Sequence, residues 1–143
     1  MQHILNVHLR DQLRTDVVGQ AELARGEVRG SVDMSVAFAD LVGFTKLGER
    51  VPPEELGAVA ERLTALTLAT VPPPVRLVKS IGDAVMLVSP EPDPLLDAAL
   101  SLVAAADEEG EEFPRLRAGV ATGRVLGRAG DWYGSPVNLA SRI

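Results

Sequence analysis

The chain has 143 residues, of which 46% are hydrophobic and 24% charged, so it is long enough for one domain with a buried core. Its formal net charge of −6 argues against nucleic acid as a partner, and the absence of cysteine excludes disulfides and thiolate metal sites. No segment approaches the roughly 20 consecutive apolar residues that span a bilayer, and the N-terminal residues do not form the uninterrupted apolar run of a signal peptide. We therefore expect a soluble, cytoplasmic protein.

The N-terminal segment predicts a separate helix. Residues 4–25 carry an apolar side chain at every fourth position, from Leu5 to Ala21, which is typical of an amphipathic helix. Gly26 and Gly30 end this pattern. We interpret residues 1–30 as a linker or regulatory helix and residues 31–143 as the main domain.

The first half of the main domain predicts a strand, a helix and a hairpin. Alternating apolar side chains favour a strand over residues 31–40, and residues 41–45 form a turn into a helix. Prolines before acidic residues at 51–56 predict a helix that ends near Thr70. Residues 75–89 predict two strands with a tight turn near Gly82, and prolines 90, 92 and 94 indicate a loop.

The second half adds a helix over residues 95–108, closed by Gly110, and a strand over 115–123 that is followed by another. Residues 134–143 predict a helix with Ser135 as its cap and Pro136 in its first turn. The fold class is therefore α/β (α+β), with a ferredoxin-like β-α-β-β-α-β core and one extra strand and helix. Such a core covers one face of a sheet with two helices.

The segment "FADLVGFT" (residues 38–45) places a carboxylate where an apolar strand ends. Val36, Phe38 and Asp40 share one side of that strand, and Gly43 allows the backbone to turn into a helix. Backbone amides at such a turn can hold phosphate, and a carboxylate beside phosphate needs a cation such as Mg²⁺ between them. The alternative is that Asp40 is a simple helix-capping acid.

The hairpin "RLVKSIGDAVMLV" (residues 76–88) carries two charges among apolar residues. Asp83 lies at the predicted turn, where it can approach Asp40 on a neighbouring strand, and two close carboxylates repel unless a cation neutralises them. The alternative is a salt bridge between Lys79 and Asp83 across the turn.

The segment "GDWYGSPVNLASR" (residues 130–142) carries Asn138 and Arg142, which are four residues apart and therefore share a helix face. Arginine is well suited to binding a charged phosphoryl group. The alternative is a surface helix with an exposed arginine.

Taken together, these motifs resemble the catalytic domain of class III nucleotidyl cyclases, the adenylate and guanylate cyclase homology family. The segments "FADLVGFT", "KSIGD", "RAGVATG" and "DWYGSPVNLASR" occur in the family's order and approximate spacing, from about Val32 to Ile143. The sequences of these motifs are especially similar to those of actinobacterial members, some of which carry a regulatory domain before a connecting helix. Family domains continue past the position of Ile143, so this sequence resembles a truncated piece of a longer protein whose N-terminal regulatory domain is missing from this chain.

The resemblance implies a role for each residue of these motifs. Two divalent ions, Mg²⁺ or Mn²⁺, are held by Asp40 and Asp83. The phosphates are contacted by Gly43, Phe44, Thr45 and Arg117, the base by Lys79 and Asp131, the ribose by Asn138, and the transition state by Arg142.

The same resemblance implies ATP as substrate and 3′,5′-cyclic AMP with pyrophosphate as products. A lysine donates and an aspartate accepts, which fits adenine, whereas guanine reverses both edges. By analogy, two copies pair head to tail, and each composite site combines the acids of one copy with Lys79, Asp131, Asn138 and Arg142 of the other. The alternatives are a guanylate cyclase, or a truncated and inactive module that binds nucleotide or dimerises.

Overall fold

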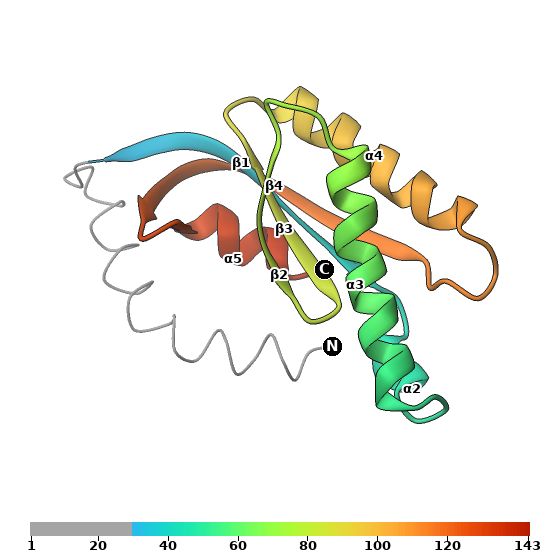
Figure 1. Cartoon of the computed structure of the whole chain (residues 1–143). Coiled ribbons are helices and arrows are strands. Elements are labelled where there is room, and N and C mark those ends of the chain that lie inside the picture. The colour runs from blue at the N-terminus through green and yellow to red at the C-terminus, as the bar shows by residue number, and fades with distance from the viewer. Residues whose placement is uncertain (1–29) are drawn as a thin grey trace.

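The computed structural model describes residues 30–143, and the helix predicted over residues 4–25 lies outside them. Short connections join the strands and helices of the described part (Figure 1). In chain order they are β1 (Ser31–Leu41), α2 (Phe44–Leu47), α3 (Pro53–Thr70), β2 (Arg76–Ile81), β3 (Ala84–Ser89), α4 (Pro92–Glu108), β4 (Leu116–Arg128), β5 (Asp131–Tyr133) and α5 (Ser135–Ser141).

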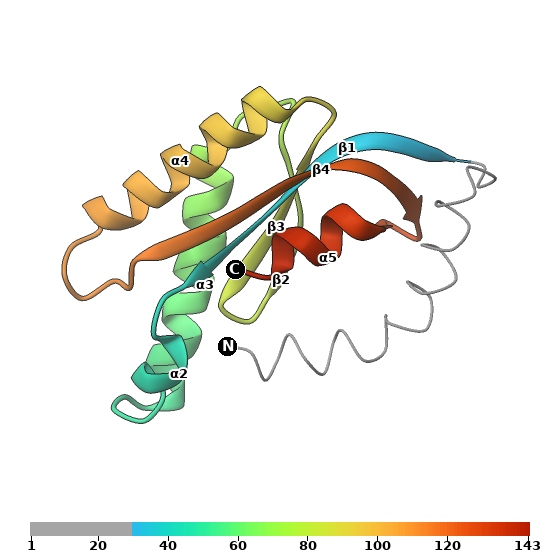
Figure 2. The same ribbon diagram turned by 180° about the vertical axis from the view of Figure 1, so that it is seen from behind.

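The five strands form one sheet in the order β2-β3-β1-β4-β5, and every neighbouring pair is antiparallel. The long strands β1 and β4 run side by side through the middle of the molecule (Figure 2). The first four strands and helices α3 and α4 reproduce the predicted β-α-β-β-α-β order, while β5 and α5 are the predicted additions. The ferredoxin-like prediction is therefore confirmed.

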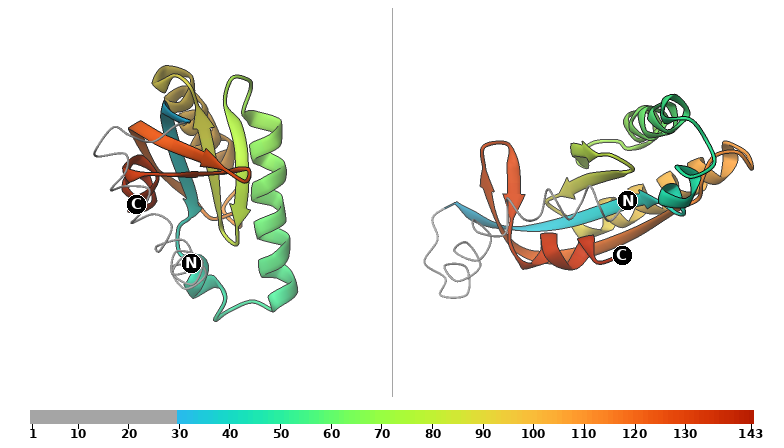
Figure 3. Two further views of the ribbon diagram at one scale, coloured as in Figure 1. Left: turned by 90° about the vertical axis from the view of Figure 1, so that its left-hand side faces the viewer. Right: turned by 90° about the horizontal axis from the view of Figure 1, so that it is seen from below.

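The two faces of the sheet are covered by different helices. Because side chains alternate along a strand, Ala37, Ala39 and Leu41 of β1 face α3 and α4, whereas Val36 and Phe38 face α5. Figure 3 shows α5 and α3 on opposite sides of the sheet. The face under α3 and α4 holds the larger apolar cluster, which contains the fully buried leucines Leu63, Leu87, Leu95 and Leu102.

Two predicted helix starts were wrong by a few residues. Helix α4 begins at Pro92, so two prolines assigned to a loop lie in its first turn. Proline is tolerated there because the first N–H groups of a helix have no acceptor within it. Helix α5 is capped by Gly134, and Ser135 is its first residue with no side-chain cap bond. Among residues 30–143, no helix combines the length and the apolar character needed to cross a bilayer.

Candidate functional site

Two carboxylates meet where β1 ends beside the β2–β3 turn. Asp40 lies opposite Ala84 in the ladder between β1 and β3, and the backbone N–H of Leu41 donates to the carbonyl oxygen of Asp83 at 3.0 Å. Gly82 has φ 58°, which allows the tight turn that carries Asp83. Asp40 and Asp83 are 2% and 0% exposed. The structure therefore brings together the two acids that the sequence predicted to be neighbours.

Burial disfavours the charged form of both acids. The pKa of Asp83 is raised to about 6, mainly by its removal from water and also by the nearby charge of Asp40. Burial also raises the pKa of Asp40, although a hydrogen bond and the positive charge of Arg117 act in the opposite direction. A cation that binds between the two carboxylates would relieve this cost.

Arg117 already places a positive charge against one of the acids. It lies opposite Asp40 in the ladder between β1 and β4, and its Nε donates to Asp40 Oδ1 at 3.0 Å. Its side chain is half exposed, whereas Asp40 is buried. The capping alternative for Asp40 is wrong, because α2 begins after Gly43 and has no side-chain cap bond.

The acid pair has the chemistry of a site for a hard divalent cation. Carboxylate oxygens are the ligands that Mg²⁺ and Mn²⁺ prefer, and Mg²⁺ is often bound by one or two carboxylates together with substrate phosphates and water. Within residues 30–143, no group of three or more acidic, histidine or cysteine side chains could hold a metal ion alone. Asp40 and Asp83 therefore fit a cation that also takes ligands from a bound substrate.

A second charged pair joins the two edges of the sheet. Lys79 on β2 donates from Nζ to Asp131 Oδ2 on β5 at 2.6 Å, and the two side chains are 21% and 17% exposed. Strands β2 and β5 are the outermost strands, so the twist of the sheet must bring its edges close together. Lys79 thus forms an ion pair with Asp131, the residue that the family resemblance assigns with it to the base. The alternative predicted from the hairpin alone was a salt bridge between Lys79 and Asp83.

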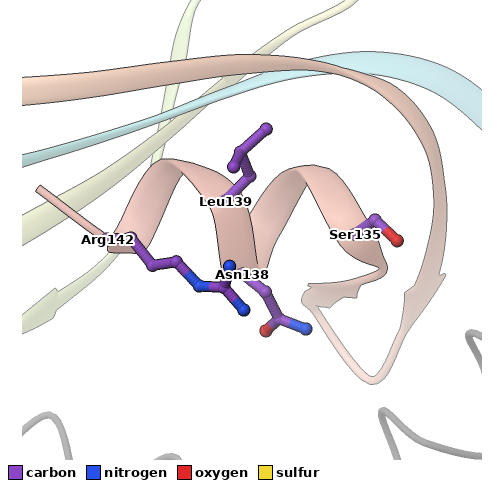
Figure 4. A pocket seen from close by; sticks show the side chains of 4 residues that line it. All are labelled: Ser135, Asn138, Leu139 and Arg142. Carbon is purple, nitrogen blue, oxygen red and sulfur yellow. The ribbon is translucent and has the colours of Figure 1, made fainter.

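Helix α5 presents a polar face to a shallow pocket of about 280 Å³, lined by Ser135, Asn138, Leu139 and Arg142. Figure 4 shows the side chains of Asn138 and Arg142 on the same side of α5, as their spacing predicted, while Leu139 points away from them. The opposite side of the helix buries Val137 and Ala140 against the sheet. Packing of that apolar side directs Asn138 and Arg142 outward.

The segment between β1 and α2 adopts the tight turn that the sequence predicted. Gly43 has φ 75°, a conformation that residues with a side chain rarely adopt. Phe44 packs on the larger apolar cluster, and Thr45 is exposed beside it. The predicted phosphate contacts of Gly43, Phe44 and Thr45 remain a prediction.

Two contacts of the site could not be foreseen from the sequence. The pairing of Arg117 with Asp40 depends on the register between strands that are 77 residues apart. The contact of Trp132 with Gly127 likewise depends on the short ladder between β4 and β5. For the first contact, the sequence signal was that Asp40 and Arg117 occupy strand positions where apolar residues are usual.

Comparison with known families gives one extended match. A family model described as "Adenylate and Guanylate cyclase catalytic domain" matches residues 27–143. The chain is 54% identical over 144 residues to a pH-sensitive adenylate cyclase of Mycobacterium tuberculosis, covering all of this chain and 36% of that protein. It is 42% identical over 109 residues to an adenylate cyclase of Streptomyces griseus, covering 76% of this chain and 27% of that protein. The chain thus spans about a third of the length of these relatives.

Solved structures show the same fold. A bacterial light-regulated adenylyl cyclase superposes with a TM-score of 0.67 at 21% identity, covering 78% of this chain and 68% of that one. The catalytic core of a rhodopsin-guanylyl cyclase with converted specificity, in complex with ATPαS, gives a TM-score of 0.65 at 26% identity. That match covers 80% of this chain and 74% of the other.

Proposed function

Because this chain belongs to the adenylate and guanylate cyclase catalytic-domain family, we propose that it converts ATP into 3′,5′-cyclic AMP and pyrophosphate. The observation that carries the proposal is the pair of buried carboxylates, Asp40 at the end of β1 and Asp83 in the adjoining β2–β3 turn. Burial raises the pKa of both, which is a cost to the fold that a bound cation would offset. This pair suits a reaction at a highly charged triphosphate.

Asp40 and Asp83 are the residues that would hold two Mg²⁺ or Mn²⁺ ions together with the triphosphate. When bound, such ions lower the pKa of the attacking hydroxyl and neutralise phosphate charge. The two aspartates supply the negative charge and fix it at the end of β1 and the β2–β3 turn. Arg117 is half exposed, so its guanidinium can leave Asp40 and turn to the phosphates.

Lys79 and Asp131 would select the base. The ammonium group has three donors and the carboxylate only accepts, so together they match the acceptor N1 and the 6-amino donor of adenine. Guanine would instead place its N1–H donor against the lysine donor and its O6 acceptor against the aspartate acceptor. Both charged groups would then be mispaired. A mispaired buried group costs about 1–3 kcal/mol, which is enough to favour ATP over GTP.

Asn138 and Arg142 would act on the ribose and on the reacting phosphate. They share one face of α5 beside the pocket described above. The amide of Asn138 can orient the ribose through hydrogen bonds, and Arg142 can offset charge that develops on the phosphoryl oxygens during in-line attack by the 3′-oxygen.

We propose that a complete site needs two copies of the chain. All the residues that line the pocket come from α5 and its C-cap, Arg142, and neither aspartate of the acid pair is among them. A head-to-tail homodimer would join the acids of one copy to Lys79, Asp131, Asn138 and Arg142 of its mate, giving two equivalent sites.

The test is to incubate the protein with ATP or GTP and with Mg²⁺ or Mn²⁺, and to measure both cyclic nucleotides together with the molecular mass in solution. We expect cyclic AMP, formed faster than cyclic GMP, from a dimer. Asp40→Ala should abolish metal-dependent turnover. Cyclic AMP production by this variant at the wild-type rate would contradict the role of the acid pair, and faster cyclic GMP formation by the wild type would identify a guanylate cyclase.

A further inference from the structure

Two hydrogen bonds from different parts of the chain fix the orientation of Asp131. Its Oδ1 accepts from the backbone N–H of Trp132 at 2.8 Å, and its Oδ2 accepts from Lys79 Nζ at 2.6 Å. Rotation of an aspartate carboxylate about its last torsion is otherwise broad, so these two bonds decide which oxygen faces the lysine.

The indole of Trp132 lies directly against the backbone of β4. Gly127 is the cross-strand partner of Trp132, and a methyl group at Gly127 would lie 2.9 Å from Cζ3 and 3.2 Å from Cη2 of the indole. The ring also packs on the apolar cluster under α5. Strand β5 has only three residues and lies at the edge of the sheet, so this packed ring is a main attachment of Asp131 to the domain.

We propose that Trp132 is a positioning residue for purine selection, which acts through Asp131. The inference rests on the proposed function of the Lys79–Asp131 pair. Without the indole, the short edge strand shifts and carries Asp131 with it, so the carboxylate no longer meets Lys79 Nζ in the direction that the present geometry sets. An acceptor that is no longer aimed at the 6-amino group of adenine loses much of its ability to reject guanine.

The test is the ratio of kcat/KM for ATP to that for GTP in the wild type and in Trp132→Ala. We expect the ratio to fall about 10-fold, because that factor corresponds to the loss of one well-aligned hydrogen bond. A merely structural defect lowers the amount of active protein and reduces both rates equally, so it leaves the ratio unchanged. A wild-type ratio in Trp132→Ala would overturn the proposal.

A matched control separates stability from selection. Leu102→Ala removes a fully buried side chain from the other apolar cluster, so it should lower the unfolding temperature and leave the ratio at the wild-type value. If Leu102→Ala lowers the ratio as much as Trp132→Ala does, selection follows general stability and the proposal is wrong.

A rescue experiment tests the contact itself, and also serves if Trp132→Ala does not fold. Gly127→Ala should push the indole away and lower the ratio, and adding Trp132→Phe should restore part of it, because the smaller ring leaves room for the methyl group. Trp132 is the only tryptophan of the chain, so its fluorescence reports directly whether Gly127→Ala has moved the ring. A shifted emission spectrum with an unchanged ratio would overturn the proposal.

Failure of the proposed function has a different result. If the wild-type protein makes neither cyclic product, the proposed function fails, but base selection can still be measured without turnover. A fluorescent ATP analogue is bound and then displaced by ATP or by GTP, which gives the ratio of their affinities. Trp132→Ala should lower that ratio as well, and an unchanged ratio would overturn the inference independently of catalysis.

Discussion

Replacing Asp83 by asparagine should stabilise the protein in the absence of divalent ions. Asp83 is fully buried, and burial raises its pKa from 3.8 to about 6. A carboxyl with a raised pKa in the folded state binds its proton more tightly there than in the unfolded state. The stability that this tighter proton binding contributes is therefore fully present below pH 3.8 and is lost as the pH rises through about 6.

The difference between these two pKa values corresponds to about 3 kcal/mol at pH 7.5, where Asp83 is ionised in both states. Asparagine has the same shape and does not ionise, so Asp83→Asn avoids this cost. We expect the free energy of unfolding at pH 7.5 to rise by about 3 kcal/mol, which is roughly 10 °C in the unfolding temperature for a domain of this size. At pH 4.5 the same substitution should raise the free energy of unfolding by only about 1 kcal/mol, because Asp83 is then protonated in the folded state.

Urea unfolding with EDTA, followed by the fluorescence of Trp132, measures both values. Asp97→Asn, which alters an exposed acid on α4, is the control and should change stability by less than about 0.5 kcal/mol. The reasoning is refuted if Asp83→Asn is no more stable than the wild type at pH 7.5, or if its advantage is the same at pH 4.5. Added Mn²⁺ should stabilise the wild type more than Asp83→Asn, because ligand binding to the folded state raises stability.

Three further substitutions test other parts of the site. Arg142→Ala should lower kcat by about 10²–10³-fold. Mixing the Arg142→Ala and Asp40→Ala proteins should restore activity, because a mixed dimer contains one composite site with both residues intact. No recovery of activity would contradict the two-copy arrangement. Arg117→Gln should tighten Mn²⁺ binding without nucleotide, measured by electron paramagnetic resonance, because no guanidinium then competes for Asp40; equal or weaker binding would contradict this competition. Gly119→Ala should lower both kcat and the unfolding temperature, because its methyl group would clash with the carbonyl oxygen of Ala140 and displace α5. A wild-type kcat in Gly119→Ala would show that α5 tolerates the shift.

The order of strands and helices could be predicted because it depends on local patterns. Alternating apolar residues identified β1, and the glycine at position 82 marked the turn between β2 and β3. The meeting of Asp40 and Asp83 followed from this topology, since a β-α-β-β-α-β chain places β1 beside β3. The start of α4 was mispredicted because prolines favour both loops and first helical turns.

Contacts that depend on register and twist could not be predicted in the same way. Arg117 pairs with Asp40 only because the ladder between β1 and β4 places the two opposite each other. Residue spacing alone does not set that register, and a slip of one residue would turn the arginine to the other face. The pairing of Lys79 with Asp131 required the twist that brings the two edges of the sheet together. For that pair, the family resemblance supplied what the local patterns could not.

The two faces of the sheet explain how the fold tolerates buried charge. The face under α3 and α4 is packed by aliphatic side chains such as Leu63 and Leu102, each of which contributes about 1.5–3 kcal/mol by burial. On the other face, the short helix α5 covers only part of the sheet, and Asp40 and Arg117 lie on that side. A few such aliphatic residues offset the cost of about 3 kcal/mol at Asp83. An acid pair on the densely packed face would instead displace the aliphatic side chains that make this cost tolerable, which explains why Asp40 lies on the partly covered face.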